Sequence, residues 1–285
     1  LSRGLGDVYK RQVSKHDVKG AFLNAKLPEG KLVVVTPPEI WVKWGLVPAG
    51  VYWTLDRALY GLRESPRLWS EERDKQLSEI TWVVKEKTYY LKRCASDSQL
   101  WCLKEKAGTD KKKLHGIFVV YVDDFNLQAL PGEIRSAFLT ALGKIWKLDK
   151  EVTLTTQQPL TFLGIDMELR KNGDIFLHQK KFVASLLEKY SMHESKGNKN
   201  VQIDKLPTVE DKPDKKALKE IQSHSGEFNW LATRTRPDLV YFASILASAC
   251  TKLSGWYREL ARKILGYLRG SKDQGILITV DGDLG

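Results

Sequence analysis

The segment GIFVVYVDDFNLQA, residues 116–129, constrains the fold of this chain more than any other. The six apolar or aromatic residues 117–122 predict a buried strand, and the alternation that resumes at Phe125 predicts a second one. Two carboxylates, Asp123 and Asp124, stand side by side between them. We therefore expect a strand, a tight turn and a return strand, which together present two negative charges at the end of a rigid sheet.

Two carboxylates this close repel each other unless a cation lies between them, and hard divalent cations prefer carboxylate oxygens. Successive strand residues point to opposite faces, so Asp123 and Asp124 need not have the same role. A third carboxylate from another segment would complete a metal site. The alternative interpretation is a polar turn, which is the more frequent outcome for an Asp-Asp pair taken alone.

The patterns around this hairpin predict an α+β first part and a helical last part. Ser65 and Pro66 are typical of an N-cap and a first helical residue, and the helix after them would direct Leu68, Trp69 and Leu77 to the core. The segment LTFLGIDMEL, residues 160–169, predicts one strand, and KNGD predicts a hairpin turn after it. The other predicted elements are a strand from residue 13 that enters a turn, a short apolar run at 31–36, strands at 98–103 and 175–179, a helix at 180–190, and helices with apolar faces over 218–231, 239–253 and 260–268.

The net charge of +11 makes a polyanionic partner plausible. The first twelve residues resemble a translated sequencing adapter and carry only +2 of this charge, so we exclude them from fold reasoning. Three cysteines, Cys94, Cys102 and Cys250, lack metal-ligand spacing and indicate a reducing, intracellular setting. We see no signal peptide and no apolar run long enough to span a bilayer, so we expect no membrane partner and no secretion.

A second acidic segment, HDVKGAFLNAKL, places Asp17 shortly before Gly20, Ala21 and Phe22. Taken alone, Asp17 could cap a helix. Together with five further blocks, the segment resembles the reverse transcriptase of copia-type LTR retrotransposon polyproteins. These blocks lie in family order between about Val13 and Gly275, and they are ALYGLRESPRLW, YVDDF, FLGIDMEL, ATRTRPDLVYFASILA and KILGYLRGSKDQG.

The resemblance implies a right-hand polymerase fold and an RNA-directed DNA polymerase activity. A deoxynucleotide would be transferred to a primer 3′-hydroxyl with two Mg²⁺ ions, or Mn²⁺ in their place. The implied partners are an RNA or DNA template with its primer, dNTPs, and the integrase and RNase H domains of a parent polyprotein in a cytoplasmic particle. The expected domains are the adapter-like segment 1–12, palm with partial fingers and the start of a thumb over 13–193, a polar linker over 194–216, a helical connection region over 217–275, and over 276–285 a truncated lead-in to a missing RNase H domain.

The resemblance also assigns roles to individual residues. Asp17, Asp123 and Asp124 would be catalytic and would bind the metal ions. The dNTP would contact Gly20, Ala21, Phe22, Tyr60 and Gly61, with the Phe22 ring excluding a 2′-hydroxyl unless it is only a core residue. Template and primer would contact Ser65, Pro66 and the segment Phe162, Leu163 and Gly164. This segment would be the hairpin that holds the primer end, and its alternative is a strand with a glycine bulge. Glu64, where the family more often has Gln, would weaken contact with an anionic template, and Ala25 stands where the family more often has Gly.

Alternatives to an active polymerase remain at this stage. The family's upstream fingers segment has no counterpart in residues 1–12, so we expect little polymerase activity from this chain alone. A non-catalytic nucleic-acid-binding remnant of a decayed element is the second interpretation. A metal-dependent nuclease is the third, but the additional carboxylates and His of such sites are missing. Several basic side chains could contact phosphate or simply be solvated, namely Lys111, Lys112, Lys113, Arg234, Arg236, Arg258, Arg262 and Arg269.

Overall fold

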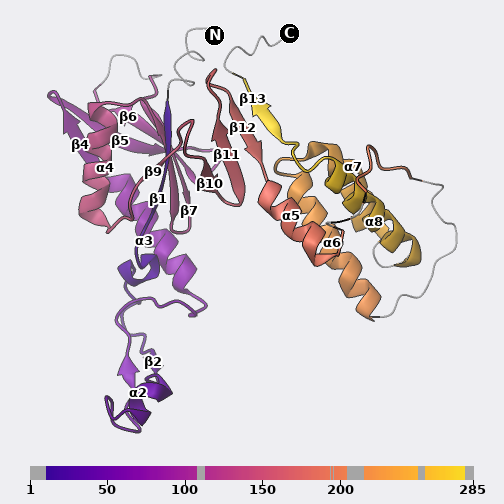
Figure 1. Ribbon diagram of the computed structural model, residues 1–285. Helices are drawn as coiled ribbons and strands as arrows, with labels where there is room; N and C mark the ends of the chain where they lie inside the picture. Colours follow the sequence, from indigo (N-terminus) through magenta and orange to yellow (C-terminus); the bar gives the residue numbers. More distant parts are fainter. Residues whose placement is uncertain are drawn as a thin grey trace. The chain divides into compact units, whose positions relative to one another are not determined.

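The computed structural model describes residues 11–107, 113–192, 194, 196–203, 215–249 and 254–279. The chain forms two compact units, Leu1–Thr153 and Leu154–Gly285 (Figure 1). Both helices and strands are present, so the α+β prediction is confirmed. None of the helices in the described part of the chain combines the length and apolar character that crossing a bilayer would require.

The first unit is built on a seven-stranded sheet in which every neighbouring pair is antiparallel. The predicted hairpin is confirmed, since two strands of this sheet, β7 and β8, pair on either side of a turn at Val122 and Asp123. The strand β1 pairs with β8. In spatial order the strands are β4 (Thr81–Val84), β5 (Lys87–Arg93), β6 (Leu100–Glu105), β7 (Gly116–Tyr121), β8 (Asp124–Ala129), β1 (Gln12–Asp17) and β9 (Val152–Thr153).

Helices α3 (Ser65–Glu79) and α4 (Glu133–Ile145) contribute to one apolar core with this sheet. Phe118 of β7 is fully buried, and its ring packs against Phe125 of β8 and Phe138 of α4. Leu68, Trp69 and Leu77 of α3 are buried as the helical spacing predicted. The hairpin that carries the acidic pair is therefore fixed from one face by two helices.

Residues 21–54 add short elements to the first unit. They are η1 (Ala21–Asn24), β2 (Val34–Val35), α2 (Glu39–Lys43) and β3 (Trp53–Thr54), with β2 and β3 paired. The short apolar run at 31–36 thus contributes a strand of only two residues, β2. Large apolar side chains remain exposed on this segment, among them Leu32, Trp44, Leu46 and Tyr52.

The second unit combines a four-stranded sheet with a helical core. Its strands are β10 (Leu160–Phe162), β11 (Ile165–Leu169), β12 (Ile175–His178) and β13 (Ile276–Ile278), all paired antiparallel in that order. Its helices are α5 (Lys180–Lys189), α6 (Lys215–Ala232), η2 (Pro237–Leu239), α7 (Val240–Ala249) and α8 (Ser254–Gly270). The predicted apolar faces form one core, although Leu218 and Phe242 are only half-buried and Leu253 lies outside the described residues.

The local pattern predicted one strand at 160–169, whereas the family resemblance implied a hairpin at Phe162, Leu163 and Gly164. The segment is a hairpin, because Leu163 and Gly164 adopt φ angles of 50° and 76° and reverse the chain between β10 and β11. The prediction of Ser65 as an N-cap was wrong, because helix α3 begins at Ser65 rather than after it. The Ser65 hydroxyl donates to the Leu59 carbonyl at 2.6 Å instead of capping the helix.

The two compact units divide before the predicted linker. Helix α5 shares its apolar core with α6 and α8, so residues 180–189 belong with the helices that follow them. Residues 204–214, in the middle of the predicted linker 194–216, lie outside the described residues. Residues 276–278, which the sequence assigned to a lead-in segment, pair with β12. The domain names themselves stay a prediction.

Candidate active site

The three predicted catalytic carboxylates occupy adjoining positions at one end of the first unit's sheet. Asp17, the last residue of β1, lies directly opposite Asp124, the first residue of β8. Directly opposed residues of an antiparallel pair direct their side chains to the same face. Asp123 precedes Asp124 in the turn, and its carbonyl accepts a hydrogen bond from the Val18 N–H at 3.1 Å. Strand register thus brings together acids from opposite ends of the first unit's sequence.

Negative charge is concentrated at this end of the sheet. Burial raises the pKa of Asp17, and the nearby charges of Asp123, Asp124 and Asp149 raise it further. Two lysines offset part of this charge. The Lys15 Nζ lies 2.7 Å from an Asp124 carboxylate oxygen, and the Lys19 Nζ lies 2.6 Å from an Asp149 carboxylate oxygen.

The sequence did not point to Asp149 as part of this cluster. Its backbone N–H donates to the Asp17 carbonyl at 2.9 Å, which places it beside the end of β1. In the sequence it lies among alternating charges, KLDKE, which are typical of an exposed loop. Only the tertiary pairing of residues 147–149 with 17–19 reveals its position.

The carboxylates of Asp17, Asp123 and Asp124 are ligands of the kind that a hard divalent cation prefers, but their present arrangement is not that of a metal-binding site. Among the side chains that the structure describes, no group of three or more His, Cys, Asp or Glu is placed to hold a metal ion. The Asp124 carboxylate is engaged by Lys15. Three adjoining carboxylates nevertheless offer only oxygen ligands, and the repulsion that raises the pKa of Asp17 is what a divalent cation would relieve.

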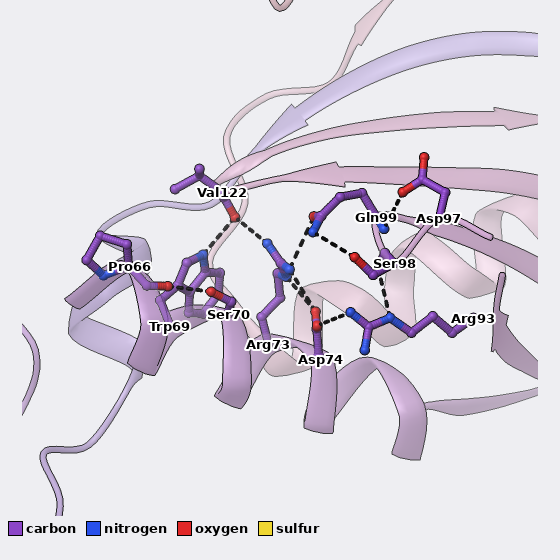
Figure 2. Close-up of polar contacts among 10 residues, drawn as sticks. All are labelled: Pro66, Trp69, Ser70, Arg73, Asp74, Arg93, Asp97, Ser98, Gln99 and Val122. Carbon is purple, nitrogen blue, oxygen red and sulfur yellow. Dashed lines mark hydrogen bonds and ion pairs between the residues drawn. The ribbon is translucent and has the colours of Figure 1, made fainter. Parts of the chain in front are cut away.

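The turn itself has an unusual backbone. Val122 adopts a φ of 53°, which β-branched residues rarely do. Its carbonyl accepts two hydrogen bonds from α3, at 2.7 Å from Trp69 Nε1 and 3.3 Å from Arg73 Nη1. Figure 2 shows both bonds converging on the Val122 oxygen. The backbone immediately before the acidic pair is thus fixed by side chains from a helix.

Several predicted nucleotide contacts lie near the acids. Gly20 has a φ of 61° and turns the chain from β1 into η1, where Ala21 is fully buried. The Phe22 ring packs against Tyr60 with centroids 4.4 Å apart. Burial, together with the negative charges of Asp123 and Asp17, raises the pKa of Tyr60. The Tyr60 hydroxyl therefore lies within the electrostatic influence of the acidic cluster. Gly61 has a φ of 98° and forms the bend that follows.

The predicted template and primer contacts belong to both units. Ser65 is fully buried, so its hydroxyl serves the turn before α3, whereas Pro66 is exposed. Phe162, Leu163 and Gly164 form the hairpin turn of the second unit. There a side chain in place of Gly164 would meet the Trp230 ring at 3.3 Å. Glu64 forms an ion pair with Lys31, which offsets the negative charge expected to disfavour an anionic template.

The basic side chains of the second unit have different environments. Arg236 is 2% exposed, and its guanidinium bonds Asp238 and Ser271, so the interpretation that it contacts phosphate is wrong. Arg234 is exposed and stacks over the Trp230 ring at 4.6 Å. Arg258 pairs with Glu220, at 3.1 Å between Nη2 and the carboxylate. Arg262 is exposed and Arg269 is half-buried. Of the three lysines in the first unit, Lys113 is exposed, and Lys111 and Lys112 lie outside the described residues.

Comparison with known proteins gives consistent results. Residues 3–204 match the family model described as reverse transcriptase (RNA-dependent DNA polymerase). The chain is 26% identical over 257 residues to the putative transposon Ty5-1 protein of Saccharomyces cerevisiae, which covers 88% of this chain and 74% of that protein. It is 24% identical over 275 residues to the retrovirus-related Pol polyprotein from transposon TNT 1-94 of Nicotiana tabacum. That match covers 91% of this chain but spans only 18% of the tobacco polyprotein.

Proposed function

Since the chain belongs to the reverse transcriptase (RNA-dependent DNA polymerase) family, in its copia-type retrotransposon branch, we propose that it forms the polymerase core that transfers a deoxynucleotide to a primer 3′-hydroxyl. The observation that carries the proposal is the register that sets Asp17 opposite Asp124, with Asp123 beside them in the turn. In this assignment the first unit's sheet is the palm, the short elements of residues 21–54 belong to the fingers, and the helices of the second unit are the thumb and connection.

Asp17, Asp123 and Asp124 would hold two divalent cations, Mg²⁺ or Mn²⁺, which would stabilise the attacking and leaving oxygens of an in-line displacement. The chain's own residues prepare this site. The turn at Gly20 lets the backbone lead directly from Asp17 to the Phe22 ring. Lys15 pairs with Asp124 and Lys19 pairs with Asp149, which reduces the repulsion among the neighbouring carboxylates.

The proposed partners are a template–primer duplex and dNTPs. The basic balance of the chain favours a polyanion, because Lys and Arg side chains that neutralise phosphates release counterions. The non-catalytic nucleic-acid-binding remnant remains the second candidate. One observation favours it, since Lys15 holds Asp124 in an ion pair that a metal ion would have to displace.

Primer extension separates the two candidates. We expect the chain to extend an oligo(dT) primer on a poly(rA) template with dTTP and Mg²⁺, only slowly because little activity is expected from this chain alone, to stop when EDTA is added, and to resume when Mg²⁺ is restored in excess. The control is the same primer without template. Retention of the template–primer without any metal-dependent extension would favour the non-catalytic remnant and contradict the proposed polymerase.

Replacing Phe22 by alanine should relax the choice of sugar. The Phe22 ring, held against Tyr60, would fill the space that a 2′-hydroxyl needs. We expect Phe22→Ala to raise ribonucleotide over deoxynucleotide incorporation by about tenfold or more. The measurement is the ratio of kcat/KM for rUTP and dTTP. The matched control is Leu23→Ala at the neighbouring, exposed position. An unchanged ratio would leave Phe22 with only its packing role against Tyr60.

A further inference from the structure

We propose that Trp69 and Arg73 are positioning residues for the acidic turn. Their side chains hold the Val122 carbonyl and so fix where Asp123 and Asp124 lie. The inference rests on the proposed function, because only carboxylates that bind metal ions need this accuracy. Neither residue contacts the acids directly, and both would act through the backbone of the turn.

The first step of the argument is the strain at Val122. With its φ of 53°, Val122 lies in a region where a β-branched side chain crowds the backbone. A strained residue at a functional site persists only when its surroundings over-determine it. Here the surroundings are two hydrogen bonds to one carbonyl, from Trp69 at 2.7 Å and from Arg73 at 3.3 Å.

The second step is the network that fixes Arg73. Its side chain is 2% exposed, and Nη2 and Nε both donate to Asp74, at 2.8 Å and 2.9 Å. Asp74 also accepts a hydrogen bond from Arg93 of β5 at 2.7 Å. Figure 2 shows the resulting chain of contacts from Arg93 through Asp74 and Arg73 to the oxygen of Val122.

Gln99 adds a second route from this network to the turn. Its side-chain oxygen accepts from Arg73 Nη2 at 3.4 Å, and its backbone carbonyl accepts from the Val120 N–H at 2.9 Å. Val120 lies in β7, two residues before Val122. The network therefore contacts the strand that leads into the turn as well as the turn itself.

The third step concerns the residue types. Position 73 lies on the buried face of α3, where Leu68 and Leu77 pack in the core. Burying a guanidinium there costs solvation, which its hydrogen bonds must offset. Trp69 packs its ring against Trp146 at 5.3 Å, but its Nε1 is directed to Val122. Both side chains thus combine a core position with a polar group aimed at one carbonyl.

The test measures metal binding and needs no catalysis. Free Mn²⁺ is followed by electron paramagnetic resonance while the full chain is titrated, and binding lost in Asp123→Asn defines the acidic site. We expect Trp69→Phe and Arg73→Met each to weaken Mn²⁺ binding at that site by about tenfold or more. The matched control is Arg67→Met, an exposed arginine of the same helix that pairs with Glu71, and its binding should be unchanged.

A double-mutant cycle with Val122→Gly distinguishes positioning from general support. Glycine adopts a positive φ without strain, so the turn should depend less on its anchors. We expect Trp69→Phe to weaken Mn²⁺ binding in both backgrounds. The fold-loss in affinity should be less than half as large in the Val122→Gly background as in the parent chain. Equal losses in both backgrounds would overturn the role proposed for the anchors.

The outcomes separate this inference from the proposed function. If Asp123→Asn leaves Mn²⁺ binding unchanged, the metal site of the proposed function fails, and the inference fails with it. If Asp123→Asn abolishes binding but folded Trp69→Phe and Arg73→Met bind as the parent does, the inference alone is overturned. Circular dichroism establishes folding. Should Arg73→Met not fold, Trp69→Phe decides, because phenylalanine keeps most of the packing with Trp146 and removes only the donor.

Discussion

Asp123→Asn will reduce primer extension by about a thousandfold or more while the chain stays folded. Asparagine keeps the shape of the side chain but removes the charge that would hold a divalent cation. Metal ions supply several kcal/mol of transition-state stabilisation in phosphoryl transfer, and about 4 kcal/mol corresponds to roughly a thousandfold in rate. The measurement is the single-turnover rate on a poly(rA) template at saturating Mg²⁺, with circular dichroism as the test of folding.

The matched control for this change is Asp56→Asn, which makes the same substitution at an exposed position. It should extend primers at the parent rate. Asp17→Asn should reduce the rate as much as Asp123→Asn, and the double variant should be little worse than either, because residues that act as a unit are not additive. A rate for Asp123→Asn above a tenth of the parent value would remove this residue from the proposed metal site.

Arg236→Met will lower the free energy of unfolding by about 2–3 kcal/mol, because it removes a buried guanidinium and the charge-assisted hydrogen bonds that it donates. The Arg236 guanidinium donates to Asp238 at 2.7 Å, to the Ser271 carbonyl at 3.0 Å and to the Ser271 hydroxyl at 2.8 Å. Urea denaturation followed by far-ultraviolet circular dichroism measures the loss. The control is Arg234→Met, two residues away, which removes an exposed stack on Trp230 worth about 0.5–1 kcal/mol.

The same ion pair has a pH signature. Burial pushes the pKa of Asp238 up, but hydrogen bonds from Arg236 and Tyr267 outweigh burial and hold that pKa below its usual value. A lowered carboxyl pKa contributes stability that is complete above the ordinary carboxyl pKa and is lost as pH falls through the lowered one. The difference in stability between the parent and Arg236→Met should therefore shrink in acid. Equal destabilisation by the changes at 234 and 236 would contradict the structural role of Arg236.

Local patterns predicted the elements whose signals are strong in sequence. The β7–β8 hairpin and helix α3 have long apolar runs or helical spacing, and both were found. Strands β4 and β5 and helix α4 were not predicted. The β4–β5 turn is formed by Lys85 and Glu86, both with positive φ, and neither residue type is a usual signal for such a turn. The turn at Leu163 and Gly164 was expected from the family resemblance, whereas the local apolar pattern alone predicted a single strand there.

The site was predictable only in part because half of its geometry is non-local. The family resemblance brought Asp17, Asp123 and Asp124 to attention before any pairing was known. Asp149 and Arg73 carry no such signal, since their partners are backbone groups of distant segments, Asp17 and Val122. The burial of Arg236 could not be predicted either, because the sequence around a basic residue in a charged motif does not show whether its side chain is exposed or buried.

The register between β1 and β8 also bears on how copies of such a sequence lose their function over time. Side chains alternate along a strand, so loss of one codon within residues 12–16 would carry Asp17 to the opposite face if the rest of β1 kept its pairing. The reading frame of the gene would be intact, and most of the core of the first unit comes from other segments. A copy that encodes an inactive protein could then keep every motif residue that identifies its family. The length of the strand that leads into the first motif, and not the motifs alone, would distinguish such a copy from an active one.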